Sequence, residues 1–192
     1  LNTEKSEFTA TGRFDLGNEN SDLNLALNST DASEIDRIIR VLNVSPDLEE
    51  QLDTYQVQLA GNLNFNGTLT GNFTDPTING RTSLDSLILR GRELGSLSSD
   101  ILVSPELVEL RNGKLQERGG GNIAFNISAP SVGTNNISVQ ATLNQINTGN
   151  LLAALPIGGL PAQFQDFQAQ TSGTINLTGL PNEMQGEANI SS

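Results

Sequence analysis

Apolar and polar residues alternate along most of this chain, which is the pattern of β-strands with one buried face. The alternation is clearest in residues 21–28 (SDLNLALN), 122–128 (NIAFNIS) and 137–143 (ISVQATL). One row of each segment is mostly leucine, isoleucine, valine or phenylalanine, and the other is mostly asparagine, threonine, serine or glutamine. The pattern predicts an all-β fold whose sheet has an apolar face and a polar face.

Glycine and asparagine punctuate the alternating segments, and we expect chain reversals at these places. Residues 55–84 contain Asn66-Gly67, Thr70-Gly71-Asn72 and Asp75-Pro76, each of which predicts a turn. Farther along, Asn112-Gly113 predicts a tight hairpin.

Two segments change to the helical period. In residues 31–42 (DASEIDRIIRVL), Asp31 can cap the helix and Glu34 follows three residues later, as in a capping box. Residues 147–155 (NTGNLLAAL) offer Asn147 as a cap and then three leucines as an apolar stripe. A further short helix is expected over 45–52, which begins Ser-Pro.

Both main helical segments follow an alternating strand and precede a glycine-punctuated segment. The residues at 61, 67 and 80 are glycines, and so are those at 173, 179 and 186. This order predicts a repeat of about 110 residues. We expect residues 1–192 to form one continuous domain, with repeat units at approximately 8–122 and 123–192 and the second unit incomplete.

Composition removes several kinds of chemistry. The chain has no cysteine, histidine or tryptophan, which excludes thiolate nucleophiles, disulfides, histidine-based metal sites and serine-histidine triads. The carboxylates at Glu49, Glu50 and Asp75 are expected on an exposed helix or in a turn, and the acidic run 18–22 lacks the rest of a calcium loop. We therefore expect no enzyme activity, no metal site and no cofactor.

Charge and termini affect the expected partners and location. The net charge of −12 opposes binding to nucleic acid or to an anionic membrane surface. The chain starts at Leu1 without a leader or a long apolar run, so we expect it to be part of a longer protein whose anchor lies outside this segment. The net charge does not oppose the binding of neutral apolar ligands.

The apolar face could bind lipid or could be a dry core. A strand of nine residues spans about 30 Å, whereas the hydrocarbon of one lipid leaflet is about 15 Å deep. Each acyl methylene removed from water contributes about 0.8 kcal/mol, so the face could hold an acyl chain without polar contacts. A second sheet could equally close over it, as in a β-sandwich, and periodicity alone favours that closed core.

The residues also resemble a known family. The glycine-bounded alternating segments at 61–84 (GNLNFNGTLTGNFTDPTINGRTSL) and 91–128, together with the helical inserts at 31–42 and 147–155, are similar to the TamB and AsmA-like bacterial envelope proteins. The Asp75-Pro76 element between two glycines is the best-matched part. The second copy, at 179–186, departs from the pattern because it lacks the Asp-Pro pair.

The resemblance implies a long, curved antiparallel sheet with two short helices, called a β-taco, whose half-rolled groove is apolar. It implies a periplasmic protein anchored to the inner membrane, without catalytic residues, that conducts phospholipid acyl chains toward the outer membrane in outer-membrane biogenesis. It also implies an outer-membrane barrel-assembly protein as a partner. The expected groove lining consists of the alternating apolar residues Leu63, Phe65, Leu87, Leu89, Ile101, Val103, Ile123, Phe125, Ile127, Ile137, Val139, Ile175 and Leu177.

Two other functions stay open at this point. The first is a surface or adhesive β-sandwich module with a closed core and a structural role. The second is a carboxylate-dependent hydrolase acting on glycans, which would need two carboxylates facing each other across a cleft.

Overall fold

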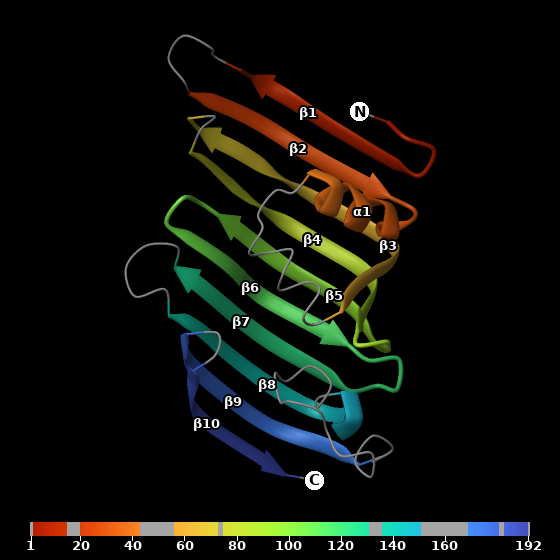
Figure 1. Ribbon diagram of the computed structural model, residues 1–192, viewed down its shortest axis with the longest axis vertical. Helices are drawn as coiled ribbons and strands as arrows, with labels where there is room; N and C mark the ends of the chain where they lie inside the picture. The colour runs from red at the N-terminus through yellow and green to blue at the C-terminus, as the bar shows by residue number, and fades with distance from the viewer. Residues whose placement is uncertain are drawn as a thin grey trace.

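The protein is one open, curved antiparallel sheet of ten strands (Figure 1). The computed structural model describes residues 2–14, 20–42, 56–72, 75–130, 136–150, 169–180 and 183–191, and only the backbone over 38–42. Each strand pairs with the strand that precedes it and the one that follows it in the chain, so the two ends of the described chain lie at opposite edges of the sheet. The predicted all-β class and the long curved antiparallel sheet are confirmed.

The elements follow one another as a meander, with an α-helix inserted between the second and third strands. They are β1 (Ser6–Arg13), β2 (Ser21–Ser29), α1 (Ala32–Leu42), β3 (Val57–Gly71), β4 (Pro76–Leu89), β5 (Arg92–Val103), β6 (Leu107–Gln116), β7 (Asn122–Pro130), β8 (Ile137–Asn147), β9 (Gln170–Leu180) and β10 (Glu183–Ser191).

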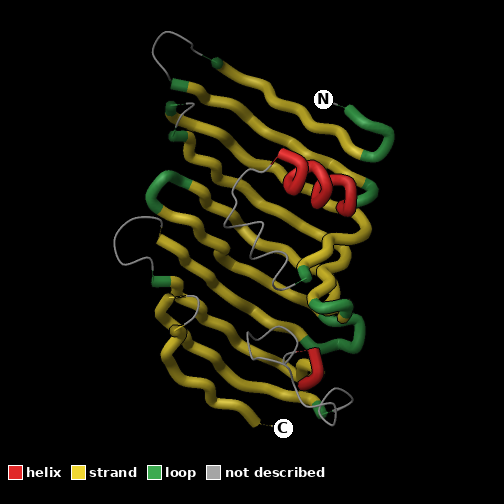
Figure 2. Tube along the Cα trace, viewed as in Figure 1, coloured by secondary structure: helices red, strands yellow, loops and turns green. Residues whose placement is uncertain are grey.

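Helix α1 lies across one face of the sheet, over β3 (Figure 2). Asp31 caps it as predicted, because its Oδ1 accepts the backbone N–H of Ser33 at 3.1 Å. Glu34 does not complete a capping box. Its carboxylate instead accepts the Thr3 hydroxyl at 2.7 Å, while the N–H of Asp31 donates to the hydroxyl of Ser29 at 3.2 Å.

A second helical turn begins where the sequence predicts it. Residues 148–150 are helical, and the Asn150 N–H donates to Oδ1 of Asn147 at 3.3 Å, which confirms Asn147 as the cap. The remainder of this predicted helix, 151–155, and the helix predicted at 45–52 lie outside the described residues.

Two of the predicted turns are wrong because their residues lie inside strands. Asn66-Gly67 is in the middle of β3, and Asn112-Gly113 is within β6. Asn112 has a positive φ of 52°, the conformation expected in a hairpin turn, but here it sits at a register shift between β6 and β7. The turn predicted at Asp75-Pro76 is confirmed, since it joins β3 to β4.

The order of elements expected for a repeat occurs twice in the structure, but the strand register differs between the two copies. The order strand, helical turn, then a strand pair occurs from β2 to β4 and again from β8 to β10. In the first pair Gly67 lies directly opposite Gly80, whereas Gly179 lies opposite Met184 and Gly186 lies opposite Leu177. The division into two units therefore stays a prediction, and the sheet runs through it without a break.

Candidate apolar binding face

One face of the sheet carries rows of apolar side chains that run across the strands. Directly paired residues of neighbouring strands point to the same face, so the register defines each row. One row, which we call the central row, passes through all ten strands without interruption. It consists of Ala10, Leu25, Gly67, Gly80, Ile101, Leu110, Ile127, Val139, Leu177 and Gly186.

A second unbroken row, the helix-side row, lies nearer α1. It consists of Ser6, Ser29, Leu63, Leu84, Leu97, Leu115, Ile123, Leu143, Gly173 and Ile190. Leu84 and Leu143 are only 4% and 3% exposed. At β3, Ala32 and Ile35 of α1 pack on this row. The row is therefore already dry at these positions.

The predicted lining residues all lie on this face. Four of them belong to the central row and two to the helix-side row, and the rest lie between or beside these rows. Leu87, beyond a register shift in β4, packs against the cluster of Ala32, Leu63 and Leu84, and Leu89 follows it two residues later. Ile175 packs with Leu143 and the fully buried Ile146 in a second cluster.

Exposure differs between the two rows. The central-row residues Ile101, Ile127, Val139 and Leu177 are all only half-buried, whereas four leucines of the helix-side row, Leu63, Leu84, Leu115 and Leu143, are buried. At about 4.8 Å per strand, a row across ten strands is about 43 Å long. The central row is thus a long, partly exposed apolar strip beside a row that is buried at four of its leucines.

Two predicted lining residues, Phe65 and Phe125, lie flat on the sheet. A methyl group added at Gly113 would meet Cε2 of Phe125 at 2.3 Å, and one added at Gly67 or Gly80 would meet Cζ of Phe65 at 2.7 Å. The rings thus fill the spaces that the missing side chains leave. The two rings therefore lie against the sheet and do not project from the apolar face.

Polar contacts fix α1 to the start of the first strand. Nζ of Lys5 lies 2.6 Å from Oδ2 of Asp31, and Glu34 accepts hydrogen bonds from the hydroxyls of Thr3 and Ser6. The hydrogen bond from Lys5 lowers the pKa of Asp31 to about 2. The hydroxyls of Ser6 and Thr3 lower the pKa of Glu34, and the bond to Asp31 raises the pKa of Lys5. Above about pH 4.5, the higher of the two ordinary carboxyl pKa values, these contacts hold the helix over the helix-side row.

A buried carboxylate holds the second helical turn. Glu117, which is 7% exposed, accepts the backbone N–H of Asn147 at 2.9 Å and Nδ2 of Asn150 at 2.7 Å. This acceptor comes from the loop between β6 and β7 and satisfies a donor at the helix start. Its role here is structural, and it is absent from the residues that the sequence predicts for the site.

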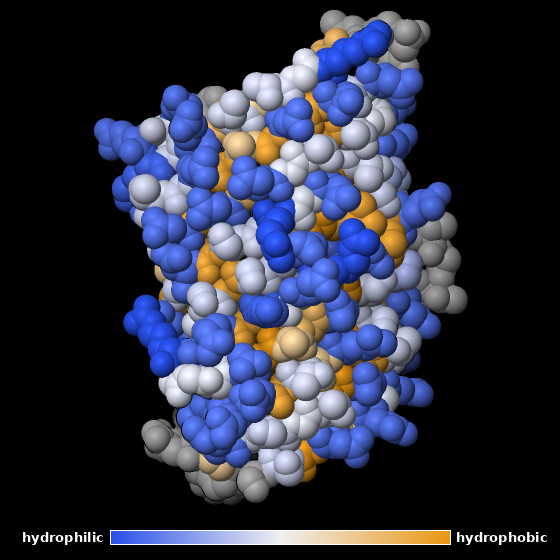
Figure 3. Space-filling view, turned by 180° about the vertical axis from the view of Figure 1, so that it is seen from behind, coloured by the Kyte–Doolittle hydropathy of each residue, from blue (hydrophilic) through white to orange (hydrophobic). Residues whose placement is uncertain are grey.

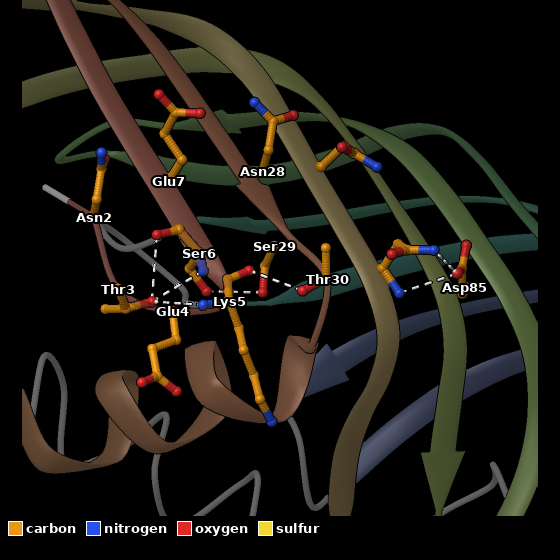
Figure 4. Close-up of a pocket in the computed structure, with 12 residues that line it drawn as sticks. Asn2, Thr3, Glu4, Lys5, Ser6, Glu7, Asn28, Ser29, Thr30 and Asp85 are labelled. Carbon is orange, nitrogen blue, oxygen red and sulfur yellow. Dashed lines mark hydrogen bonds between the residues drawn. The ribbon is translucent and has the colours of Figure 1, made fainter.

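The opposite face of the sheet is mainly polar (Figure 3). Asn126, Gln140 and Asn176 form one of its rows and contribute to a recess of about 430 Å³. A larger recess of about 560 Å³ lies beside the start of β1 (Figure 4), and Asp85 in its wall accepts two hydrogen bonds from Asn62. The residues lining this larger recess are all polar, so it does not suit an acyl chain.

Among the described residues, no group of three or more acidic residues is arranged to hold a metal ion. Asp75 lies in the β3–β4 turn, while Glu49 and Glu50 fall outside the described part of the chain. None of the helices in that part is long and apolar enough to span a membrane.

Several residues of the apolar face were missing from the predicted lining. Leu25, Leu69, Ile78, Leu97 and Leu110 lie in the same rows as the predicted residues. Alternation marked most of them as apolar, but only the pairing register shows which residues of different strands are neighbours.

Comparison with known proteins yields no relative: no family model matches the chain, and no curated protein or solved structure is detectably similar to it.

Proposed function

We propose that this chain is a non-enzymatic lipid-binding segment whose apolar face holds the acyl chains of phospholipids along the central row. The observation that carries the proposal is the unbroken apolar register across all ten strands, on a face where the central row stays half-exposed. In line with its resemblance to TamB and AsmA-like proteins, we place it in the periplasm as part of a path for lipids between the membranes. An outer-membrane barrel-assembly protein is the partner that this role would require.

The expected binding free energy of an acyl chain suits transfer of lipid better than its storage. An acyl chain of about 16 methylenes lying on an open face loses water on one side only, which gives about half of 0.8 kcal/mol per methylene, or ~6 kcal/mol. Association costs at least ~4 kcal/mol in lost freedom. The surplus is small, so a chain can bind and move on along the row.

Site-specific crosslinking tests the proposal. A photoreactive residue at Phe65, Phe125 or Val139 in cells should capture phospholipid. The matched controls are Asn126 and Gln140, which neighbour two of these positions in the strands and point to the polar face. If no lipid adduct forms at any of the three apolar positions, the proposed lipid-binding function is wrong.

A second test uses the isolated chain. Nile red should gain fluorescence on binding the apolar face, and Ile127→Asp, which places a charge in the central row, should remove most of that gain. Asn126→Asp, one residue earlier on the polar face, should leave it unchanged.

The second candidate is a structural module without a ligand. The dry helix-side row favours it, because Leu84 and Leu143 are already buried. The ten described strands form one sheet, however, so they do not supply the two sheets of a β-sandwich. Failure of the chain to take up Nile red would favour this candidate.

A further inference from the structure

A recess on the polar face of the sheet, which we call the amide recess, has the size of a small-molecule site. Its volume of about 430 Å³ lies within the ~300–1,000 Å³ typical of ligand pockets. We propose that the amide recess binds neutral N-acetylated sugars, independently of lipid binding on the other face. Two neighbouring rows line it, one of Asn126, Gln140 and Asn176, and the other of Lys114, Ala124, Thr142 and Thr174.

A short side chain leaves space in the middle of the recess. Ala124 of β7 lies directly between Lys114 of β6 and Thr142 of β8. Its methyl group is smaller than any other side chain of the two rows, and the residue is exposed. A ligand can therefore occupy the space above β7.

The bulge in β6 fixes one wall of the recess. Asn112, with its φ of 52°, donates its backbone N–H to Oδ1 of Asn126 at 3.0 Å, and its Nδ2 donates to Oδ2 of Asp100 at 2.8 Å. The Asn126 amide thus has one orientation, in which Oδ1 is already bonded and Nδ2 can donate to a ligand. A group that is held in place before binding loses little freedom when the ligand arrives.

The other polar groups of the recess can bond a ligand. The side chains of Lys114, Gln140, Thr142, Thr174 and Asn176 are exposed and have no hydrogen-bond partner among the described residues. Amides and hydroxyls both donate and accept hydrogen bonds, as the hydroxyls of a sugar do. Because neighbouring strands are about 4.8 Å apart, these groups can contact successive hydroxyls of a sugar chain that lies across the strands.

The distribution of charge favours a neutral ligand. The chain has 22 acidic residues, yet none of the residues lining the recess is acidic. Acidic residues flank the recess instead, since Asp100 lies beyond Asn112 and Glu187 lies opposite Asn176 on β10. These carboxylates would repel an anion, while Lys114, the charged residue of the lining, would repel a cation.

Ala124 favours a sugar that carries an acetamido group. In the two rows it is the one side chain without a polar atom, so it offers a contact for the acetamido methyl group. The amides around it can bond the N–H and the C=O of the same group. A sugar with a hydroxyl at that position would place a polar group against the Ala124 methyl without a partner.

NMR titration of the 192-residue chain tests the site. Chitotetraose, an oligosaccharide of N-acetylglucosamine, should shift the side-chain amide signals of Asn126, Gln140 and Asn176 in a saturable way. Cellotetraose, the matching glucose oligosaccharide, should bind about 2- to 10-fold more weakly, because it lacks the hydrogen bond of the acetamido group.

Variants with matched controls locate the binding. Asn176→Ala should weaken the binding of chitotetraose by about 2- to 10-fold, whereas Asn24→Ala, at an exposed asparagine of β2 outside the recess, should leave Kd unchanged. Ala124→Arg fills the recess and should abolish binding, and Thr9→Arg, at an exposed position of β1, should have no effect. Absence of saturable shifts, equal affinity for cellotetraose, or binding that survives both Asn176→Ala and Ala124→Arg would each overturn the proposal.

Discussion

Replacing Gly95 with alanine tests the close contact between β5 and β6. Gly95 is buried in β5 with a positive φ of 122°, a conformation that other residues rarely adopt. A Cβ at this position would lie 2.0 Å from the carbonyl oxygen of Gln116 and 2.9 Å from its carbonyl carbon. These are backbone atoms, so the clash can be relieved only if the strands move apart.

The expected cost combines three contributions. Backbone strain at such a φ costs about 1–3 kcal/mol. Strand separation next to the Ser96–Gln116 pair removes one or two backbone hydrogen bonds, each contributing about 0.5–1.5 kcal/mol. Alanine also lowers the conformational entropy of the unfolded chain, which offsets about 0.4–1 kcal/mol of the lost stability. We expect Gly95→Ala to lower the free energy of unfolding by about 1–5 kcal/mol.

Urea denaturation followed by circular dichroism measures this loss against two matched variants. Gly91→Ala has a positive φ of 74° but no atom within 4 Å of the new methyl, so it isolates backbone strain. Gly119→Ala has equally open space around it and no positive φ, so it isolates the effect on the unfolded chain. A midpoint for Gly95→Ala equal to that of Gly91→Ala would show that the clash with Gln116 contributes nothing and would refute the reasoning.

The remaining predictions concern the buried clusters and the contacts at α1. Ile146→Ala empties a site that is 0% exposed and should cost about 2–5 kcal/mol in urea unfolding. Glu117→Ala leaves the Asn147 N–H without its acceptor and should cost about 1–3 kcal/mol by the same measurement. Because Asp31 has a pKa of about 2 when folded and about 3.8 ordinarily, its pair with Lys5 stabilises the fold above pH 3.8 and is lost as the pH falls toward 2. Asp31→Asn should therefore flatten the pH dependence of the unfolding midpoint in that window.

Exposed positions supply the controls for these variants. Ile190→Ala removes the same atoms as Ile146→Ala from a side chain that is 50% exposed, and should change stability little. Glu106→Ala is the matching control for Glu117→Ala, because it removes a carboxylate that is exposed, and it should also change stability little. A pH profile of Asp31→Asn identical in shape to that of the wild type would contradict the assignment of the low pKa.

The sequence predicted the strands well because one-sided alternation is a direct consequence of a sheet with one buried face. The helix at 31–42 was equally accessible, since Asp31 and the isoleucine spacing determine it locally. Both properties depend on residues close in the chain.

The failures occurred where long-range pairing decides local structure. Asn112-Gly113 resembles a hairpin turn because Asn112 needs a positive φ, but a bulge uses the same conformation. There the N–H of Asn112 donates to Oδ1 of Asn126, a residue of the next strand. The turn prediction at Asn66-Gly67 fails for a similar reason, because Gly67 lies opposite Gly80 and leaves room there for the ring of Phe65.

The same limit applies to the binding face. Alternation identifies which residues of one strand share a face, and all predicted lining residues do lie on one face. The difference between the helix-side row, buried at four leucines, and the half-exposed central row depends on where α1 docks and on how the strands are staggered. Neither can be read from single segments.

The phenyl rings that lie over glycines have an evolutionary consequence. A Cβ at 113 would lie 2.3 Å from Cε2 of Phe125, so a side chain at 113 requires the ring at 125 to turn away from its present place. Among descendants of this sequence, loss of the glycine should be accepted more readily where the ring has been replaced by a smaller group. The two positions should therefore tend to change together, although they lie on different strands.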